Sequence, residues 1–111
     1  MMDLVRFLED REKAESVRTG GFQKSHDISI YLGPIPDIGI PAPLDSYWLW
    51  IVDDSLPGPG WNKYSVYVEK EGMPNPGDWL DREGLRMRNA GYKCVRIYYD
   101  SLFIGHYGSG E

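Results

Sequence analysis

The sequence predicts an α+β domain with a mostly antiparallel sheet of about four to five strands. Candidate elements follow the order helix, three strands, helix, two strands. Successive strand candidates are separated by turn-forming segments rather than helices, which is typical of antiparallel pairing. A strongly amphipathic segment at about 78–90 predicts a main helix packed on one face of the sheet. The length of 111 residues fits a single domain, 1–111, with one core.

The strongest strand signal is Tyr47–Val52, an unbroken run of apolar and aromatic residues closed by Asp53 and Asp54. The run is too short for a buried helix and is rich in β-branched and aromatic side chains. One face carries Tyr47, Leu49 and Ile51, and the other carries Trp48, Trp50 and Val52. Because both faces are apolar, we expect this strand to lie inside the sheet, with neighbours on both edges.

The other strand candidates supply those neighbours. Residues 28–32 alternate as a half-buried strand, and residues 64–69 are predicted to pair with 47–52 as an antiparallel hairpin with a long loop. Residues 92–99 form the last long strand, followed by a turn into 102–104. In 92–99 the alternation predicts two faces: Val95, Ile97 and Tyr99 toward the core, and Cys94, Arg96 and Tyr98 away from it.

Two helices are expected. Residues 1–18 form an N-terminal helix whose first turns can dock through Leu4, Phe7 and Leu8. The main helix places on its sheet side Trp79, Leu80, Glu83, Gly84, Met87 and Ala90. Gly84 on that side predicts a close approach of helix backbone to sheet, and Gly91 is the natural end of the helix.

Two segments are predicted to lack regular structure. The proline-rich stretch 33–46 contains prolines that exclude a helix and a central strand. It is either a loop wrapped over the core or an exposed extended segment that a partner grips. The glycine-rich end, 105–111, is predicted to be a frayed tail.

Charge and composition restrict the partners. The formal net charge is −5 and the sequence pI is about 5.0, which disfavours binding to a nucleic-acid backbone and suits a basic protein surface. Cys94 is the single cysteine, so a reduced compartment is the simpler interpretation. The first ten residues carry acids where a signal peptide needs bases, and their apolar run is too short for a membrane span. We therefore expect a soluble, cytoplasmic protein without a membrane partner.

The residues that could carry chemistry form no strong pattern. His26 and His106 lie far apart and belong to no ligand motif, so neither a metal site nor a cofactor is predicted. Cys94 with a histidine could form a nucleophilic pair, but a mid-strand cysteine is more often a packed side chain. Asp53 and Asp54 could hold a cation or act as a base, but acids at strand ends more often cap turns. No catalytic residue is assigned, and a non-enzymatic protein is favoured.

The more informative set is aromatic. If the strand faces are assigned as above, one face of the sheet carries Trp48, Trp50, Tyr67, Arg96 and Tyr98. Aromatic rings with an arginine make a stacking platform for bases or sugars, or an anchor patch for a protein. The alternative is that the first helix or the proline-rich loop covers this face and makes it a second small core. A homodimer through the same face would need the same residues.

These observations lead to a main hypothesis: a small, acidic, non-enzymatic protein that binds another protein as an inhibitor. A toxin-immunity protein and a phage anti-defence protein are examples of such a role. The candidate partner-binding residues are Trp48, Trp50, Trp61, Tyr67, Arg96, Tyr98, Asp53, Asp54, Asp78 and Asp81. One alternative is a module that binds a nucleotide or glycan on the aromatic face. Another is a small hydrolase that uses Asp53, Asp54, His26 or His106. A monomer or a homodimer is expected.

Overall fold

The computed structural model describes residues 2–15, 23–34, 45–53, 64–100 and 102–108. It has two helices and a five-stranded sheet, which confirms the predicted α+β class. The elements in chain order are α1 (Leu4–Glu15), β1 (Asp27–Gly33), β2 (Ser46–Asp53), β3 (Tyr64–Glu69), α2 (Pro76–Asn89), β4 (Cys94–Tyr99) and β5 (Leu102–Gly108).

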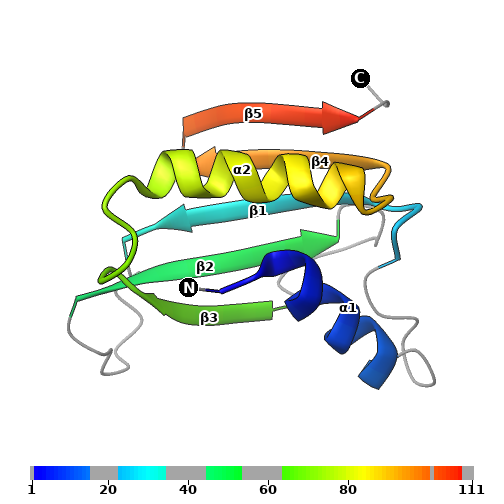
Figure 1. Cartoon of the computed structure of the whole chain (residues 1–111), viewed down its shortest axis with the longest axis horizontal. Helices are drawn as coiled ribbons and strands as arrows, with labels where there is room; N and C mark the ends of the chain where they lie inside the picture. The colour runs from blue at the N-terminus through cyan, green and yellow to red at the C-terminus, as the bar shows by residue number, and fades with distance from the viewer. Residues whose placement is uncertain (1, 16–22, 35–44, 54–63, 101, 109–111) are drawn as a thin grey trace.

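The strands lie in the order β3-β2-β1-β4-β5 (Figure 1). The pair β1–β4 is parallel, and the other three pairs are antiparallel. β2 lies inside the sheet between β3 and β1, as its two apolar faces predict, and its predicted hairpin with β3 is confirmed. The middle strand is β1. Its central place depends on the parallel pairing with β4, a strand far along the chain, which local patterns do not indicate.

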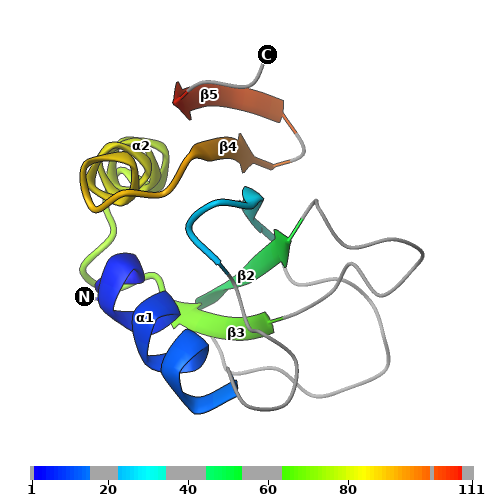
Figure 2. The same cartoon turned by 90° about the vertical axis from the view of Figure 1, so that its right-hand side faces the viewer.

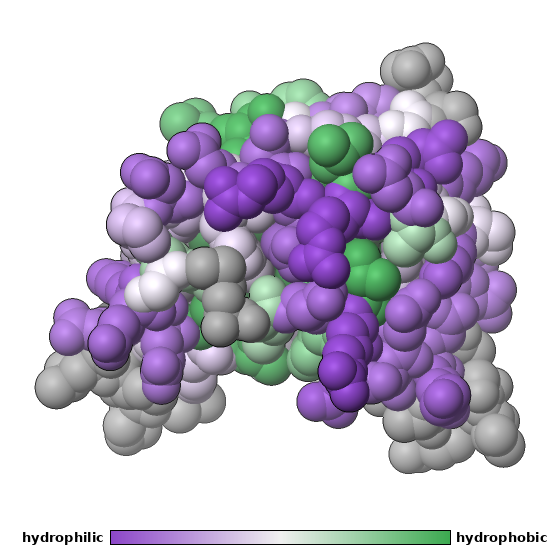
Figure 3. All heavy atoms as spheres, in the orientation of Figure 1, coloured by the Kyte–Doolittle hydropathy of each residue, from purple (hydrophilic) through white to green (hydrophobic). Residues whose placement is uncertain are grey.

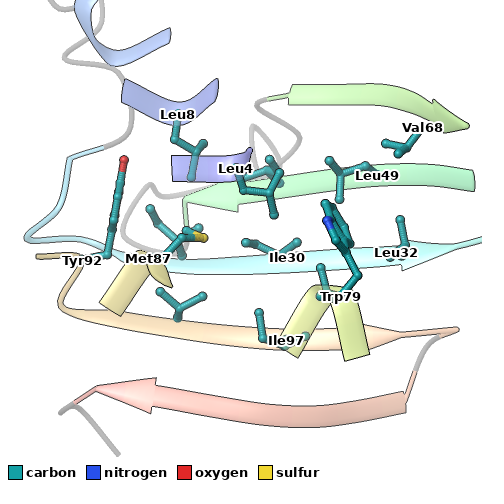
Figure 4. Packing of buried hydrophobic residues seen from close by; sticks show 14 of the residues in the cluster. Leu4, Leu8, Ile30, Leu32, Leu49, Val68, Trp79, Met87, Tyr92 and Ile97 are labelled. Atoms are coloured by element: carbon teal, nitrogen blue, oxygen red, sulfur yellow. The ribbon is translucent and has the colours of Figure 1, made fainter. Parts of the chain in front are cut away.

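Both helices lie on the same side of the sheet (Figures 1 and 2). The core fills the space between them and the sheet, as Figure 4 shows for Ile30, Leu49, Met87 and Ile97. The inward side of the sheet is therefore the one predicted from the alternation. Its buried apolar members are Ile28, Ile30, Leu32, Leu49, Ile51, Val95 and Ile97, and Tyr47 and Tyr99 are half-buried beside them. Burial of these apolar side chains is the main source of stability in a domain of this size.

α1 begins at Leu4 because Asp3 caps it. The Oδ1 atom of Asp3 accepts a hydrogen bond from the Arg6 backbone N–H at 3.2 Å. Leu4 and Leu8 are buried, while Phe7 is half-buried with its ring edge toward Tyr64 at 6.1 Å between centroids. Of the predicted helix 1–18, the structure describes residues 2–15, and residues 1 and 16–18 lie outside the described part.

α2 matches the predicted main helix. Its buried residues are Trp79, Leu80, Glu83, Gly84 and Met87. A methyl group added at Gly84 would lie 3.0 Å from Ile97 Cδ1 and from two ring atoms of Tyr107. The predicted close approach of helix to sheet is therefore present. Gly91 follows the helix with φ of +108°, a conformation that favours glycine.

Two boundaries differ from the sequence expectations. The frayed tail predicted for 105–111 is wrong for residues 105–108, which belong to β5, and residues 109–111 lie outside the described part. The glycines suggested a tail, but Gly105 and Gly108 pair with Ile97 and Cys94 of β4. The backbone pairing with β4 therefore outweighs the preference of glycine for turns. The last long strand begins at Cys94 instead of Tyr92, whose fully buried side chain packs in the core.

The proline-rich segment was predicted to be either a loop over the core or an exposed segment that a partner grips, and its residues 35–44 lie outside the described part. Its predicted first and last residues, 33 and 46, belong to β1 and β2. Among the described residues, neither helix is long and apolar enough to cross a membrane.

Candidate functional site

The side of the sheet turned away from both helices carries a large aromatic cluster. We call this surface the aromatic face. Its aromatic members are Tyr31, Trp48, Trp50, Tyr67, Tyr98 and Phe103. Except for Phe103, which is 56% exposed, these side chains are half-buried. The structure thus places on one face all five residues that the sequence grouped there, Arg96 included.

Four rings form a continuous row across four strands, which we call the aromatic ladder. Trp50 of β2 contacts Tyr31 of β1, with ring centroids 5.5 Å apart. Tyr31 stacks on Tyr98 of β4 at 4.6 Å and an interplanar angle of 13°. Tyr98 in turn meets Phe103 of β5 at 5.4 Å. The row follows from register, because Tyr31 lies directly opposite both Trp50 and Tyr98. Directly opposed aromatic residues stabilise a sheet and hold one another in place.

The neighbouring row contains a gap. Trp48 packs on Tyr67 with ring centroids 5.5 Å apart, but its partner on β1 is Gly33, which has no side chain. Asp100 lies beside Gly33, and the Asp100 backbone N–H donates to the Leu32 carbonyl oxygen at 2.8 Å. The gap is part of a pocket of about 420 Å³, which we call the Gly33 pocket. Its described lining residues are Tyr31, Leu32, Gly33, Pro34, Trp48, Trp50, Tyr98 and Asp100.

Arg96 lies on the other side of the ladder from the pocket. Its register partners are Ser29 on β1 and His106 on β5. The Arg96 guanidinium is 3.6 Å from the Asp27 carboxylate. Arg96 therefore joins the aromatic face as a paired charge.

Cys94 and His106 form a close pair at the β4–β5 end of the same face. The sulfur of Cys94 lies 3.0 Å from His106 Nε2. This is the cysteine–histidine contact that a nucleophilic pair would need. The Cys94 side chain is fully buried, however, so a substrate has no path to its sulfur in this conformation. The arrangement suits a packed, hydrogen-bonded thiol.

The second histidine pairs with a buried aspartate. His26 Nδ1 lies 2.9 Å from Asp53 Oδ2, and Asp53 is 1% exposed. A buried carboxylate does not face an approaching partner, so the role of surface steering does not suit Asp53. No group of three or more His, Cys, Asp and Glu side chains that could hold a metal ion occurs in the part of the chain that the structure describes.

Asp78 and Asp81 are exposed, but they lie on α2, on the opposite side of the sheet from the aromatic face. Asp81 accepts a hydrogen bond from the Tyr107 hydroxyl. Burial, followed by this hydrogen bond and the nearby carboxylate charge, raises the pKa of Tyr107 to about 12. The structure therefore does not bring these two acids together with the aromatic residues.

Two predicted site residues, Trp61 and Asp54, lie outside the described residues. Four residues of the site were missed: Tyr31, Gly33, Phe103 and Asp100. The alternation of Ile28, Ile30 and Leu32 already places Tyr31 and Gly33 on the outward face, so a stricter use of strand parity would have found both. Phe103 and Asp100 depend on the register of β5 and on the turn before it, which the sequence does not determine.

Comparisons with protein-family models, with curated proteins and with solved structures each found no match for this chain.

Proposed function

We propose that this chain is a non-enzymatic protein that binds another protein through the aromatic face, as an inhibitor would. The observation that carries the proposal is the aromatic face itself: six large rings gathered on the side of the sheet that neither helix covers. Binding energy in protein interfaces concentrates in Trp, Tyr and Arg anchors. Neutralisation of a toxin and inhibition of a defence complex are both roles of this kind.

The charge of the chain supports a basic partner. A net charge of −5 attracts a basic surface at long range and accelerates association at low ionic strength. Asp100 is an exposed carboxylate beside the aromatic face. An acidic protein with an aromatic centre thus offers both a source of affinity and a source of steering.

The test compares the parent protein with Trp48→Ala. A tagged parent protein captures partners from lysate, and the captured protein is then purified and its affinity measured directly. We expect Trp48→Ala to weaken binding by about 2 kcal/mol or more, because truncated aromatic anchors cost that much at interface centres. Leu85→Ala is the matched control, since Leu85 is an exposed apolar residue on α2. Equal affinities of parent and Trp48→Ala, with both folded, would remove the aromatic face from the interface.

The Gly33 pocket favours a second candidate function, a module that binds a small nucleotide or glycan. Its volume of about 420 Å³ lies within the usual range of small-molecule sites, and its walls offer rings for stacking. Titration of the protein with mononucleotides and short oligosaccharides, followed by NMR, tests it. A ligand that shifts the Trp48 and Trp50 signals at micromolar concentration would place this function first.

A further inference from the structure

We propose that the Gly33 pocket receives the cationic head group of a lysine or arginine side chain from the protein partner. The inference rests on the proposed function and specifies which partner chemistry the aromatic face recognises.

The pocket is a slot beside the aromatic ladder. Trp48 of β2 lies on one side of Gly33, and Asp100, the turn residue that follows β4, lies on the other. Because Gly33 has no side chain, the pocket between them leaves room for one inserted side chain. The backbone does not require glycine at this position: among the described residues, an added Cβ at Gly33 would meet Asp100 backbone atoms at 3.5 and 3.6 Å, an ordinary contact.

The chemistry of the walls suits a positive charge. Four of the described lining residues are Tyr or Trp, whose ring faces carry negative electrostatic potential. The only charged residue among the described lining is Asp100, which is exposed and supplies a full negative charge at one end. An ammonium or guanidinium group placed in the slot would contact the rings and approach a carboxylate at the same time.

The same walls disfavour an anionic group. A phosphate in the pocket would meet Asp100, and the described lining contains no basic side chain to neutralise it. Arg96 shares the aromatic face, but its guanidinium lies across the ladder from the pocket, 3.6 Å from the Asp27 carboxylate. The net charge of −5 opposes an anion further. Among the ligand classes that stack on aromatic rings, the cation is therefore the one that the charges favour.

Two pairs of small probes test the pocket directly. N-acetyl-lysinamide is compared with its uncharged analogue N-acetyl-norleucinamide, and N-acetyl-argininamide with N-acetyl-citrullinamide. The readout is the NMR shift of the tryptophan indole N–H groups. Trp48 and Trp50 line the pocket, whereas Trp79 is 2% exposed on the helical side of the sheet and serves as an internal reference. We expect the charged probes to shift Trp48 and Trp50 with Kd on the order of 1–10 mM, and each neutral analogue to bind at least about tenfold more weakly.

Two variants locate the binding. Gly33→Val fills the slot and should abolish the shifts. The Cβ at this position would make only ordinary contacts with the Asp100 backbone among the described residues, at 3.5 and 3.6 Å, so we expect the melting temperature to stay near that of the parent. Asp100→Asn should weaken the charged probes about threefold to tenfold. Asparagine tolerates the positive φ of +52° at this position, so the turn is kept. Glu71→Gln is the matched control, because it removes one exposed charge outside the described lining and should change nothing.

Several outcomes would overturn the proposal. Equal binding of charged and neutral probes would make the pocket a plain apolar site. Unchanged shifts in Gly33→Val would place the cation elsewhere. Tighter binding of a mononucleotide or a neutral sugar than of either cation would favour the second candidate function.

The proposed protein-binding function is tested separately with the partner itself. If the partner binds Trp48→Ala weakly but binds Gly33→Val and Asp100→Asn as tightly as the parent, the aromatic face is the interface and the cation site is wrong. If lysine and arginine probes differ by tenfold or more, the tighter one identifies the partner residue.

Discussion

Three charged side chains, Asp3, Glu83 and Arg86, connect the beginning of α1 to α2. Arg86 contacts Asp3 Oδ2 and Glu83 Oε2, both at 3.0 Å. Glu83 is 4% exposed, and its other carboxylate oxygen accepts a hydrogen bond from the Leu4 backbone N–H at 2.8 Å. A buried carboxylate is tolerated because donors surround it. Arg86 therefore bridges the cap of α1 and the buried face of α2.

The pKa of Asp3 predicts a dependence of stability on pH. The hydrogen bond from the Arg6 backbone N–H, and next the hydrogen bond from the Arg86 side chain, lower the pKa of Asp3 below its ordinary value in the folded protein. A lowered folded-state pKa stabilises the fold fully above the ordinary value, and that contribution is lost as the pH falls through the folded-state pKa. We expect Asp3→Asn, which keeps a capping side chain, to be less stable than the parent at pH 7.

Urea unfolding at about pH 7 and about pH 2 measures this difference. The difference in unfolding free energy between parent and Asp3→Asn should shrink as the pH falls through the folded-state pKa of Asp3 and the carboxylate takes up a proton. A gap that stays constant would show that the carboxylate charge contributes nothing. Glu71→Gln is a control for the loss of one exposed acid.

At the scale of elements, Gly84 sets the distance between α2 and the sheet. Alanine would normally stabilise a helix interior by about 1 kcal/mol relative to glycine. Here the added methyl would press on Ile97 and on the ring of Tyr107, both at 3.0 Å, and Tyr107 is held by its hydrogen bond to Asp81. Overpacking of this kind costs typically about 1–3 kcal/mol. We therefore expect Gly84→Ala to lower the free energy of unfolding by about 1 kcal/mol.

Gly77→Ala provides the comparison within the same helix. Its added methyl would meet Tyr99 at 3.8 Å, an ordinary contact, so this substitution should be neutral or stabilising. Chemical denaturation of both variants gives the two free energies. A Gly84→Ala protein more stable than the parent would mean that the sheet yields to α2 and that the close approach is not a constraint.

β5 is an edge strand of the sheet, and it begins with three exposed apolar side chains. Leu102, Phe103 and Ile104 are 69%, 56% and 40% exposed, and Figure 3 shows apolar atoms gathered where β5 begins. The strand contains no Lys, Arg, Asp or Glu, although edge strands commonly carry charges that prevent pairing with other chains. We expect Ile104→Lys to reduce aggregation during heating, measured by light scattering. Ile104→Thr, which adds polarity but no charge, should reduce aggregation less. An unchanged aggregation onset in Ile104→Lys would mean that β5 is not the site of association.

The sequence predicted the faces of strands better than their order. Alternation alone placed Trp48, Trp50, Tyr67 and Tyr98 on one side, because the side-chain period of a strand is fixed by its backbone. The parallel contact of β1 with β4 could not be predicted, since it joins distant segments and depends on where the whole chain packs. The Gly33 pocket needs that contact: without β4 beside β1, Tyr98 and Asp100 do not reach Gly33.

At the scale of the whole molecule, the two sides of the sheet differ in kind. The helical side presents a mainly hydrophilic surface (Figure 3), and its exposed acids include Asp78 and Asp81 of α2. The other side is the aromatic face, bordered by Asp100. α2 packs directly on the sheet, so carboxylates on its exposed side are separated from the aromatic face by the helix and the sheet together, more than about 10 Å. Screening at physiological ionic strength acts over about 8 Å.

This separation predicts which acids steer a basic partner. Asp78→Asn should change the association rate less than about twofold, whereas Asp100→Asn should lower it and weaken its salt dependence, because rim charges act mainly on association. Stopped-flow or surface-based kinetics at two ionic strengths measures both variants, with the melting temperature as a check on folding. If Asp78→Asn slows association more than Asp100→Asn does, the partner approaches the helical side. The exposed residues Leu85 and Arg88 of α2 would then replace the aromatic face as the interface to mutate.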